Sequence, residues 1–243
     1  MKGYYNIADL KVIIDNPSEI AKNRLLGYRT PEFDNADIVL KQSTAKIPDK
    51  YNTEELALSY EYMREGRNFY MSLLKYDGFM LHASAVVYEG QAFLFSASSG
   101  IGKSTHTQLW LDRFGPEAFI LNDDKPAIRV IDKDIYAYGT PWSGKNDISV
   151  NAGYKIKGIC FIERAESNVI EKMDIFTAAA RLYYSTIRSL HKEDIPKLLN
   201  LINCVADKIP IYKLGCNISI DAVELSYKTM TSEIRSSNNE KKR

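Results

Sequence analysis

Residues 97–105 read ASSGIGKST and stand between an apolar, strand-like run over 91–96 and a helical pattern over 106–114. The pattern typical of a phosphate-binding loop is G-x-x-x-x-G-K-[ST], and this chain departs from it only at Ala97, where the first glycine is usual. Because a strand precedes the loop and a helix follows it, the sequence predicts an α/β fold that binds nucleotide phosphates here. The residues expected to contact the nucleotide are Ser98, Ser99, Gly100, Ile101, Gly102, Lys103, Ser104 and Thr105.

The chemistry of this loop is local. Backbone N–H groups between Gly100 and Lys103 can point at phosphate oxygens, and the N-terminus of the following helix adds the positive end of its dipole. Lys103 would reach the β- and γ-phosphates, while the Ser104 hydroxyl would ligate Mg²⁺. The alternative is a Gly- and Ser-rich turn in which Lys103 is only a solvated residue of the first helical turn. The flanking strand and helix favour the phosphate site.

A pair of acids follows the next apolar strand, where residues 119–121 lead into Asn122, Asp123 and Asp124. A carboxylate at the end of a strand beside a phosphate loop can hold Mg²⁺ or orient the attacking group. Successive side chains of a strand point to opposite faces, so the two acids should not face one phosphate unless the chain has already bent. One acid could act as general base while the other orders water, metal or Lys125. The alternative is a turn without function, because Asn-Asp-Asp-Lys-Pro is also good turn chemistry.

Composition narrows the class of protein. The 243 residues include 32 basic and 31 acidic side chains, with 45% apolar and 11% aromatic residues, which indicates a folded and nearly neutral chain. A net charge of +1 gives no general field for a nucleic-acid backbone, so nucleic acid is not an expected partner. No apolar run is long enough to span a membrane, and the start lacks a secretory signal pattern, so we expect a cytoplasmic protein. The three cysteines are far apart and predict neither a disulfide framework nor a zinc site.

The whole chain divides into three predicted parts. Residues 1–75 are expected to form a small β-rich module that ends in a helix over 53–75, which Asn52 caps and which Gly66 could interrupt. Residues 76–235 are expected to form the nucleotide-binding catalytic domain, and 236–243 a disordered tail. Within the catalytic part we expect strands over 79–88, 91–96, 118–121, 127–131, 135–138, 156–162 and 210–214, and helices near 175–190, 195–208 and after 221.

The ordered set of residues 81–86, the loop 96–104 and the acids 122–124 resembles the catalytic core of HPr kinase/phosphorylase and its homologues. These enzymes share a P-loop fold with the ATP-dependent phosphoenolpyruvate carboxykinases. The resemblance covers residues 78–140 and is greatest to the HPr-kinase-like subgroup, which includes homologues that phosphorylate a peptide. It implies a P-loop kinase core, ATP and Mg²⁺ as cofactors, and a homo-oligomer.

The resemblance also implies roles for single residues. His82 matches a histidine on the strand before the loop, near the transferred phosphoryl group. Lys103 and Ser104 match the phosphate and Mg²⁺ ligands, and Asp123 matches the carboxylate that takes the proton from an acceptor serine. Asp124 stands beside it as the second expected metal ligand. The alternative for His82 is a strand histidine whose imidazole is satisfied by a backbone carbonyl.

The chain also departs from this family. HPr kinase carries a Glu-Ile-Arg-Gly segment after the acidic strand, whose glutamate helps to hold the metal, whereas residues 136–139 read Tyr-Ala-Tyr-Gly here. The glutamate and the arginine of that segment are both missing, so we expect that this chain does not act on HPr through the family's own interface. Two aromatic residues are ambiguous: His106 could touch the nucleotide or cover the helix start, and Trp142 could stack on substrate or pack in the core. Lys145, Arg164, Arg181 and Arg188 are candidate anion contacts.

The leading hypothesis is an ATP- and Mg²⁺-dependent kinase that transfers the γ-phosphoryl group to a hydroxyl, most plausibly a serine of a peptide or protein. Two alternatives stay open. One is a kinase that acts on a small hydroxy compound, and the other is a nucleotide-dependent binding or maturation protein that transfers no phosphoryl group.

Overall fold

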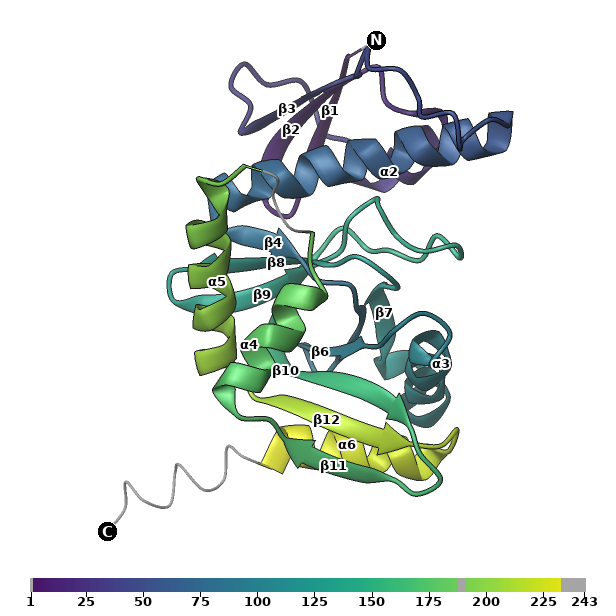
Figure 1. The fold of residues 1–243 in the computed structure, drawn as a ribbon, viewed down its shortest axis with the longest axis vertical. Helices are drawn as coiled ribbons and strands as arrows, with labels where there is room; N and C mark the ends of the chain where they lie inside the picture. The colour runs from purple at the N-terminus through teal and green to yellow at the C-terminus, as the bar shows by residue number, and fades with distance from the viewer. Residues whose placement is uncertain (1, 188–190, 233–243) are drawn as a thin grey trace.

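The structure, a computed structural model, describes residues 2–187 and 191–232 and has a mixed α/β architecture (Figure 1). The predicted tail at 236–243 and Arg188 lie outside these residues. The strands are β1 (Lys2–Ile7), β2 (Leu10–Asp15), β3 (Ile38–Lys41), β4 (Gly78–Met80), β5 (Ser84–Tyr88), β6 (Gln91–Ser96), β7 (Phe119–Asn122), β8 (Ala127–Ile131), β9 (Asp134–Tyr138), β10 (Gly153–Arg164), β11 (Val169–Lys172) and β12 (Ile211–Cys216). The α-helices are α1 (Glu19–Arg24), α2 (Glu54–Leu73), α3 (Lys103–Phe114), α4 (Ile175–Tyr184), α5 (Asp194–Lys208) and α6 (Ile220–Ser232).

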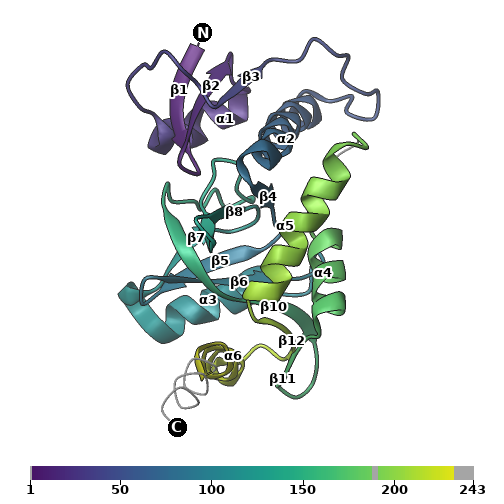
Figure 2. The same cartoon turned by 90° about the vertical axis from the view of Figure 1, so that its left-hand side faces the viewer.

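The N-terminal part is a three-stranded sheet in the order β1-β2-β3, and α2 lies across it (Figures 1 and 2). The helix predicted over 53–75 is confirmed as α2, but its N-cap is Thr53, whose side chain accepts from the backbone N–H of Leu56, and not Asn52. Gly66 does not interrupt the helix. A Cβ at Gly66 would meet Trp142 at 2.6 Å, so the glycine lets the indole ring pack directly on the helix backbone.

The larger sheet has the order β4-β8-β9-β10-β6-β5-β7, with β12 added beside β10 and β11 at its far edge. The long strand β10 pairs with β9 through its first residues and with β6 and β12 through its last, and the sheet curls along this strand. β6, β10 and β12 run parallel, whereas β5 runs antiparallel between β6 and β7. β6 is buried on both faces, as expected of a central strand with a parallel neighbour.

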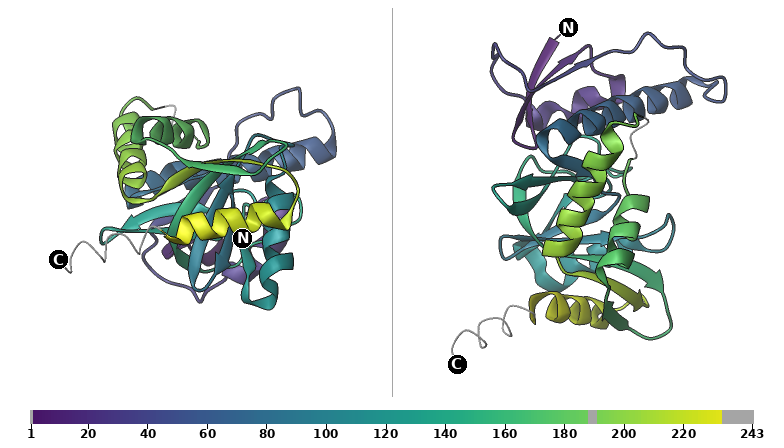
Figure 3. Two further views of the ribbon diagram at one scale, coloured as in Figure 1. Left: turned by 90° about the horizontal axis from the view of Figure 1, so that it is seen from below. Right: turned by 60° about the vertical axis from the view of Figure 1, so that its left-hand side comes forward.

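Helices cover both faces of the larger sheet. Leu94 and Ile159 pack with residues of α4 and α5 in one apolar cluster, while Phe95 and Cys160 pack with residues of α3 and α6 in another. Figures 2 and 3 show the strands between these two pairs of helices. The alternation of side chains along β6 and β10 therefore fixes which helices lie on which face.

The structure corrects one strand prediction. The run predicted as a single strand over 79–88 is broken: β4 pairs with β8 in another part of the sheet, and β5 begins only at Ser84. Glu89 and Gly90 form the tight turn between β5 and β6, with positive φ at both residues, as a two-residue hairpin loop requires. The sequence patterns missed β1, α1 and β11, which are short or lie at sheet edges.

Candidate functional site

The loop between β6 and α3 has a backbone shape that favours glycine. Gly100 has φ +80° and Gly102 has φ +122°, and a Cβ at either position would meet no described heavy atom within 4 Å. The glycines are therefore needed for conformation and not for lack of space. No side chain among the described residues caps the start of α3, so N–H groups of its first turn remain as donors for an anion.

Sheet topology brings three chain segments together at the sheet edge that carries this loop: the end of β6, the start of β5 and the end of β7. β6 and β7 both end at this edge of the sheet, and β5, which runs the other way between them, begins there. His82 lies just before β5, not on a strand as the sequence suggested, and its carbonyl accepts a hydrogen bond from Ser96 Oγ at 2.8 Å. The backbone N–H of Ala83 donates to the carbonyl of Asp124 at 3.1 Å. These bonds hold the histidine between the loop and the acids.

Charged groups gather where these segments meet. Lys103 Nζ lies 3.3 Å from Asp124 Oδ1, His82 Nε2 lies 3.6 Å from the same oxygen, and Lys125 pairs with Asp124 Oδ2. Burial raises the pKa of Asp124, but Lys125, Lys103 and His82 together outweigh it and hold that pKa below its ordinary value. Burial, and then the charge of Lys103, lower the pKa of His82, so its imidazole is neutral at pH 7.

The two acids lie beyond the end of β7 and point to different partners. Asn122 Oδ1 accepts from the backbone N–H groups of Asp124 at 3.0 Å and Lys125 at 2.6 Å, which turns the chain at this point. Asp123 Oδ1 accepts from the backbone N–H of Gly144 at 2.5 Å. Burial raises the pKa of Asp123 above its ordinary value, although the bond from Gly144 opposes the change. The bend removes the strand alternation that would have kept the acids apart.

A cavity of about 500 Å³ collects most of the predicted site residues. Its walls include Lys145, another candidate anion contact. Ile101 is the exception, because its side chain packs against the cluster that contains α3 and its backbone N–H donates to Ser98 O at 3.3 Å. The predicted residues that line the cavity are His82, Ser98, Ser99, Gly100, Gly102, Lys103, Ser104, Thr105, Asp123 and Asp124.

Arg164 has a role that the sequence did not reveal. It lies at the end of β10 and donates from Nη2 to the carbonyl of Gly100 at 2.6 Å and from Nε to that of Ile101 at 3.2 Å. By holding these carbonyls, it fixes the peptide orientation of the loop. The local sequence carries no signal for this contact, since it depends on the parallel pairing of β10 with β6.

The two ambiguous aromatic residues are packing residues. His106 is 4% exposed, accepts from Trp110 Nε1 at 3.3 Å and faces Phe95, and burial lowers its pKa to about 4. Trp142 is 1% exposed and stacks on Phe69 at a centroid distance of 4.7 Å. Neither ring is free to stack on a ligand.

The residues present fit a magnesium–nucleotide complex. The exposed Ser104 hydroxyl and the Asp124 carboxylate are oxygen donors of the kind that Mg²⁺ prefers, and the glycine loop leaves room for phosphate against its backbone. In the described part of the chain, no group of three or more His, Cys, Asp or Glu side chains could hold a metal by itself. A metal at this site would therefore need phosphate oxygens and water as further ligands, which is usual for Mg²⁺.

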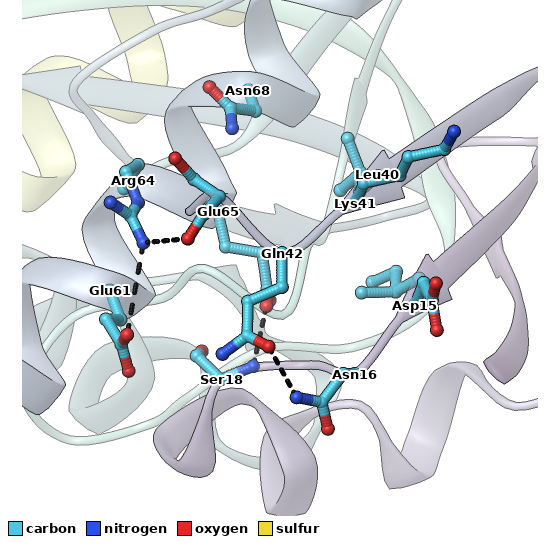
Figure 4. A pocket seen from close by; sticks show the side chains of 12 residues that line it. Asp15, Asn16, Ser18, Leu40, Lys41, Gln42, Glu61, Arg64, Glu65 and Asn68 are labelled. Carbon is cyan, nitrogen blue, oxygen red and sulfur yellow. Dashed lines mark hydrogen bonds and ion pairs between the residues drawn. The ribbon is translucent and has the colours of Figure 1, made fainter. Parts of the chain in front are cut away.

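A second pocket lies between α2 and the N-terminal sheet (Figure 4). Some of its polar groups pair with one another: Asn16 donates to Gln42 at 2.6 Å, and the backbone N–H of Ser18 donates to Glu65 at 2.7 Å. Its volume of about 30 Å³ is on the scale of one or two water molecules. This pocket is therefore too small for a substrate.

Comparisons with known proteins match this chain to a protein family and to solved structures. The protein-family model described as "SynChlorMet cassette protein ScmC" matches residues 49–222. The HPr(Ser) kinase/phosphatase from Coxiella burnetii matches with a TM-score of 0.37 and 12% sequence identity, over 66% of this chain and 98% of that one. No curated protein matches the sequence. Among the described residues, no helix has the length and apolar character to cross a membrane.

Proposed function

The chain belongs to the family of SynChlorMet cassette protein ScmC, and from the geometry of its site we propose that it is an ATP- and Mg²⁺-dependent kinase. It transfers the γ-phosphoryl group to a hydroxyl, and the acceptor that we propose is a serine of a peptide or protein. One observation carries the proposal: a glycine loop, a lysine, two acids and a histidine from three chain segments line one cavity. Residues 76–235 would form the P-loop catalytic domain, and residues 1–75 a separate module.

Binding of the triphosphate rests on the loop and Lys103. N–H groups of the first turn of α3 and of the loop backbone at Gly100 and Gly102, where φ is positive, supply donors for phosphate oxygens. Lys103 is largely buried beside Asp124, so its charge acts in a medium less polar than bulk water and attracts phosphate more strongly than a surface lysine would. Ser104 and Asp124 would hold Mg²⁺, which neutralises charge on the phosphate chain when it is bound.

Transfer would use Asp123 and His82. Asp123 takes the proton of the acceptor hydroxyl while that oxygen bonds to the γ-phosphorus and the bond from phosphorus to the leaving oxygen of ADP breaks. The raised pKa of Asp123 makes it a stronger base than an exposed aspartate. His82, neutral and 3.6 Å from Asp124, can donate a hydrogen bond to the phosphoryl oxygens.

The test is phosphoryl transfer from labelled ATP. Purified protein is incubated with ATP and Mg²⁺ alone, then with serine-containing peptides, and then with small hydroxy acids. Label in a peptide, lost in the Asp123→Asn variant, supports the proposal, and label in a small hydroxy acid points to the small-molecule kinase. Tight ATP binding with no acceptor that takes up label would favour a nucleotide-dependent binding protein.

A further inference from the structure

The loop between β9 and β10, residues 139–152, sets the position of Asp123. The backbone N–H of Gly144 donates to Asp123 Oδ1 at 2.5 Å, and the backbone N–H of Asp123 donates to the carbonyl of Ile148 at 3.2 Å. A Cβ at Gly144 would meet Asp123 Oδ2 at 2.8 Å, so the carboxylate also packs directly against the loop backbone. The direction in which Asp123 points therefore depends on where this β9–β10 loop lies.

Arg24 of α1 holds the β9–β10 loop from the N-terminal part of the chain. Its Nη1 donates to the carbonyl of Ser143 at 3.1 Å and to Ser143 Oγ at 3.2 Å, and its Nε pairs with Asp147 Oδ1 at 3.1 Å. Ser143 Oγ donates in turn to Asp147 Oδ1 at 3.0 Å. One planar guanidinium group thus ties together two loop residues that stand on either side of Gly144.

Tyr62 of α2 supports the arginine and contacts the same loop. Arg24 Nη1 donates to the Tyr62 hydroxyl at 2.6 Å, and the guanidinium carbon lies 4.8 Å from the centroid of the Tyr62 ring. The Tyr62 hydroxyl lies 3.0 Å from the carbonyl oxygen of Pro141 and 3.2 Å from that of Ser143, and donates to them. The side chain of Arg24 is only 14% exposed, so little water competes for these hydrogen bonds.

On the basis of the proposed function, we propose that Arg24 is a positioning residue of the kinase, which fixes the orientation of Asp123 through the β9–β10 loop. This assignment deepens the proposed kinase activity, because it names a residue of the N-terminal part on which the proposed base depends. The N-terminal part then contributes to phosphoryl transfer although Arg24 itself touches neither the nucleotide nor the acceptor.

The contact should matter for transfer more than for nucleotide binding. The phosphates would rest on the loop before α3, whose carbonyls Arg164 holds through contacts that do not involve the β9–β10 loop. Asp123 acts only when the proton of the acceptor hydroxyl moves, so a displaced carboxylate lowers kcat and leaves the bound triphosphate in place.

The experiment uses Arg24→Ala, Arg24→Lys and Tyr62→Phe in the full chain. The matched control is Lys22→Ala, which removes another cation of α1, one that pairs with Glu19 at the surface. Amide hydrogen exchange of the β9–β10 loop measures whether the loop is held and requires no activity. Steady-state kinetics with the acceptor that takes up label from ATP measures transfer. Titration calorimetry with ATP or inorganic tripolyphosphate, each with Mg²⁺, measures binding, and thermal unfolding establishes that each variant is folded at the assay temperature.

Arg24→Ala should speed amide exchange in the β9–β10 loop about tenfold or more, the scale of one lost charge-assisted hydrogen bond. It should lower kcat about 10- to 100-fold, as misplacement of a reacting group does, and change the dissociation constant of ATP by less than about threefold. Arg24→Lys should recover part of kcat, because an ammonium group can keep one of the contacts but not the planar fork. Tyr62→Phe should show smaller changes in the same directions, and Lys22→Ala should behave as wild type.

Two results would overturn the assignment. Unchanged exchange in Arg24→Ala would show that the β9–β10 loop keeps its place without the arginine, and faster exchange with a wild-type kcat would show that Asp123 does not depend on the loop. If Arg24→Ala fails to fold, Arg24→Lys and Tyr62→Phe decide between the same outcomes. If wild-type protein transfers no phosphoryl group to any acceptor, the proposed function fails and the role in catalysis fails with it, whereas the exchange data still decide whether Arg24 holds the loop.

Discussion

The ammonium nitrogen of Lys103 lies 3.3 Å from a carboxylate oxygen of Asp124, although the strands before them, β6 and β7, are separated in the sheet by β5. The contact is made because the chain leaves both strands at the same edge and bends inward. β5 begins at that edge, so His82, just before it, completes the group. A phosphate oxygen that reaches Lys103 would therefore meet the histidine and the acid at the same time.

The first prediction concerns Lys103. Lys103→Ala should lower kcat/KM for phosphoryl transfer on the order of 100-fold or more, the usual cost of losing one group that stabilises transition-state charge. The fold should persist, because Asp124 keeps its pairing with Lys125. Steady-state kinetics measures the loss, and thermal unfolding measures the stability. Lys228→Ala, an exposed lysine of α6, is the control and should behave as wild type. Full activity in Lys103→Ala would exclude this lysine from the site.

The second prediction concerns Asp123 as the base. Asp123→Asn should lower kcat about 100-fold or more and leave the dissociation constant of ATP nearly unchanged, since a general base acts in the transition state. Burial raises the pKa of Asp123, so the carboxyl keeps its proton to a higher pH than the ordinary value of about 3.9. The rate of wild-type protein should therefore fall as pH decreases through that raised pKa. A variant with an unchanged kcat and the same acid limb would show that another group takes the proton.

The sequence predicted the parts of the site that depend on local order. The loop 97–105 is recognisable because its chemistry needs glycines, a lysine and a hydroxyl at fixed spacing between a strand and a helix. The sequence also predicts the acids after β7, because a carboxylate at a strand end beside such a loop can hold Mg²⁺ or orient the attacking group. Their roles stay predictions.

The parts that the sequence missed depend on pairing between distant strands. Arg164 reaches the loop because β10 pairs with β6, and no pattern near residue 164 reports that partner. The break at His82 was missed for a related reason: residues 79–88 are apolar except for His82 and Ser84 and contain no Gly, Pro, Asn or Asp, so the run carries no turn signal where one strand ends and another sheet partner begins. The sequence offers a turn at Asn122 only as an alternative to the acid site, and the structure shows both, because this turn aims Asp123 at Gly144.

The third prediction concerns Arg164 as a positioning residue. Arg164→Ala removes two hydrogen bonds to loop carbonyls, worth about 1–2 kcal/mol at this exposed position, and should weaken tripolyphosphate binding about tenfold. Arg164→Lys can keep one of the bonds and should recover part of the affinity. Arg113→Ala, which removes an arginine in the last turn of α3 that pairs with Glu224 of α6, is the control. Unchanged tripolyphosphate binding in Arg164→Ala would mean that the loop holds its shape without the arginine.

The fourth prediction is a pH dependence of stability from His106. Burial lowers its pKa from 6.5 to about 4, so between these values the unfolded chain binds more protons than the folded one. Stability should therefore fall on acidification, by about 3 kcal/mol between pH 7 and pH 4 from this group. His106→Gln keeps an acceptor for Trp110 without a titrating group and should flatten this part of the curve.

Urea unfolding at several pH values measures the effect of His106. His191→Gln is the control, because its side chain is 64% exposed and the variant should keep the wild-type curve. If His106→Gln loses as much stability between pH 7 and pH 4 as wild type does, the acid sensitivity belongs to other groups.

The fifth prediction concerns Gly66 of helix α2, which packs against Trp142 near the proposed site. A Cβ at this position would lie 2.6 Å from the Trp142 ring, which is buried and stacked on Phe69 and so has little room to move. Gly66→Ala gains up to about 1 kcal/mol of helix propensity but overpacks the core at a cost of about 1–3 kcal/mol, so the net change should be destabilising. Gly27→Ala, where a Cβ meets nothing within 4 Å, should change stability by less than about 0.5 kcal/mol.

Gly66→Ala should also change the orientation of Asp123, the proposed base. Trp142 stands two residues before Gly144, whose backbone N–H donates to Asp123, so a displaced indole ring moves the donor that orients this carboxylate. Gly66→Ala should therefore lower kcat with little effect on ATP affinity, at a temperature where the variant is fully folded, because the phosphate loop is held by other contacts. Thermal unfolding and steady-state kinetics on the two glycine variants separate the effects. A destabilised Gly66→Ala variant with wild-type kcat would show that the position of Asp123 does not depend on Trp142.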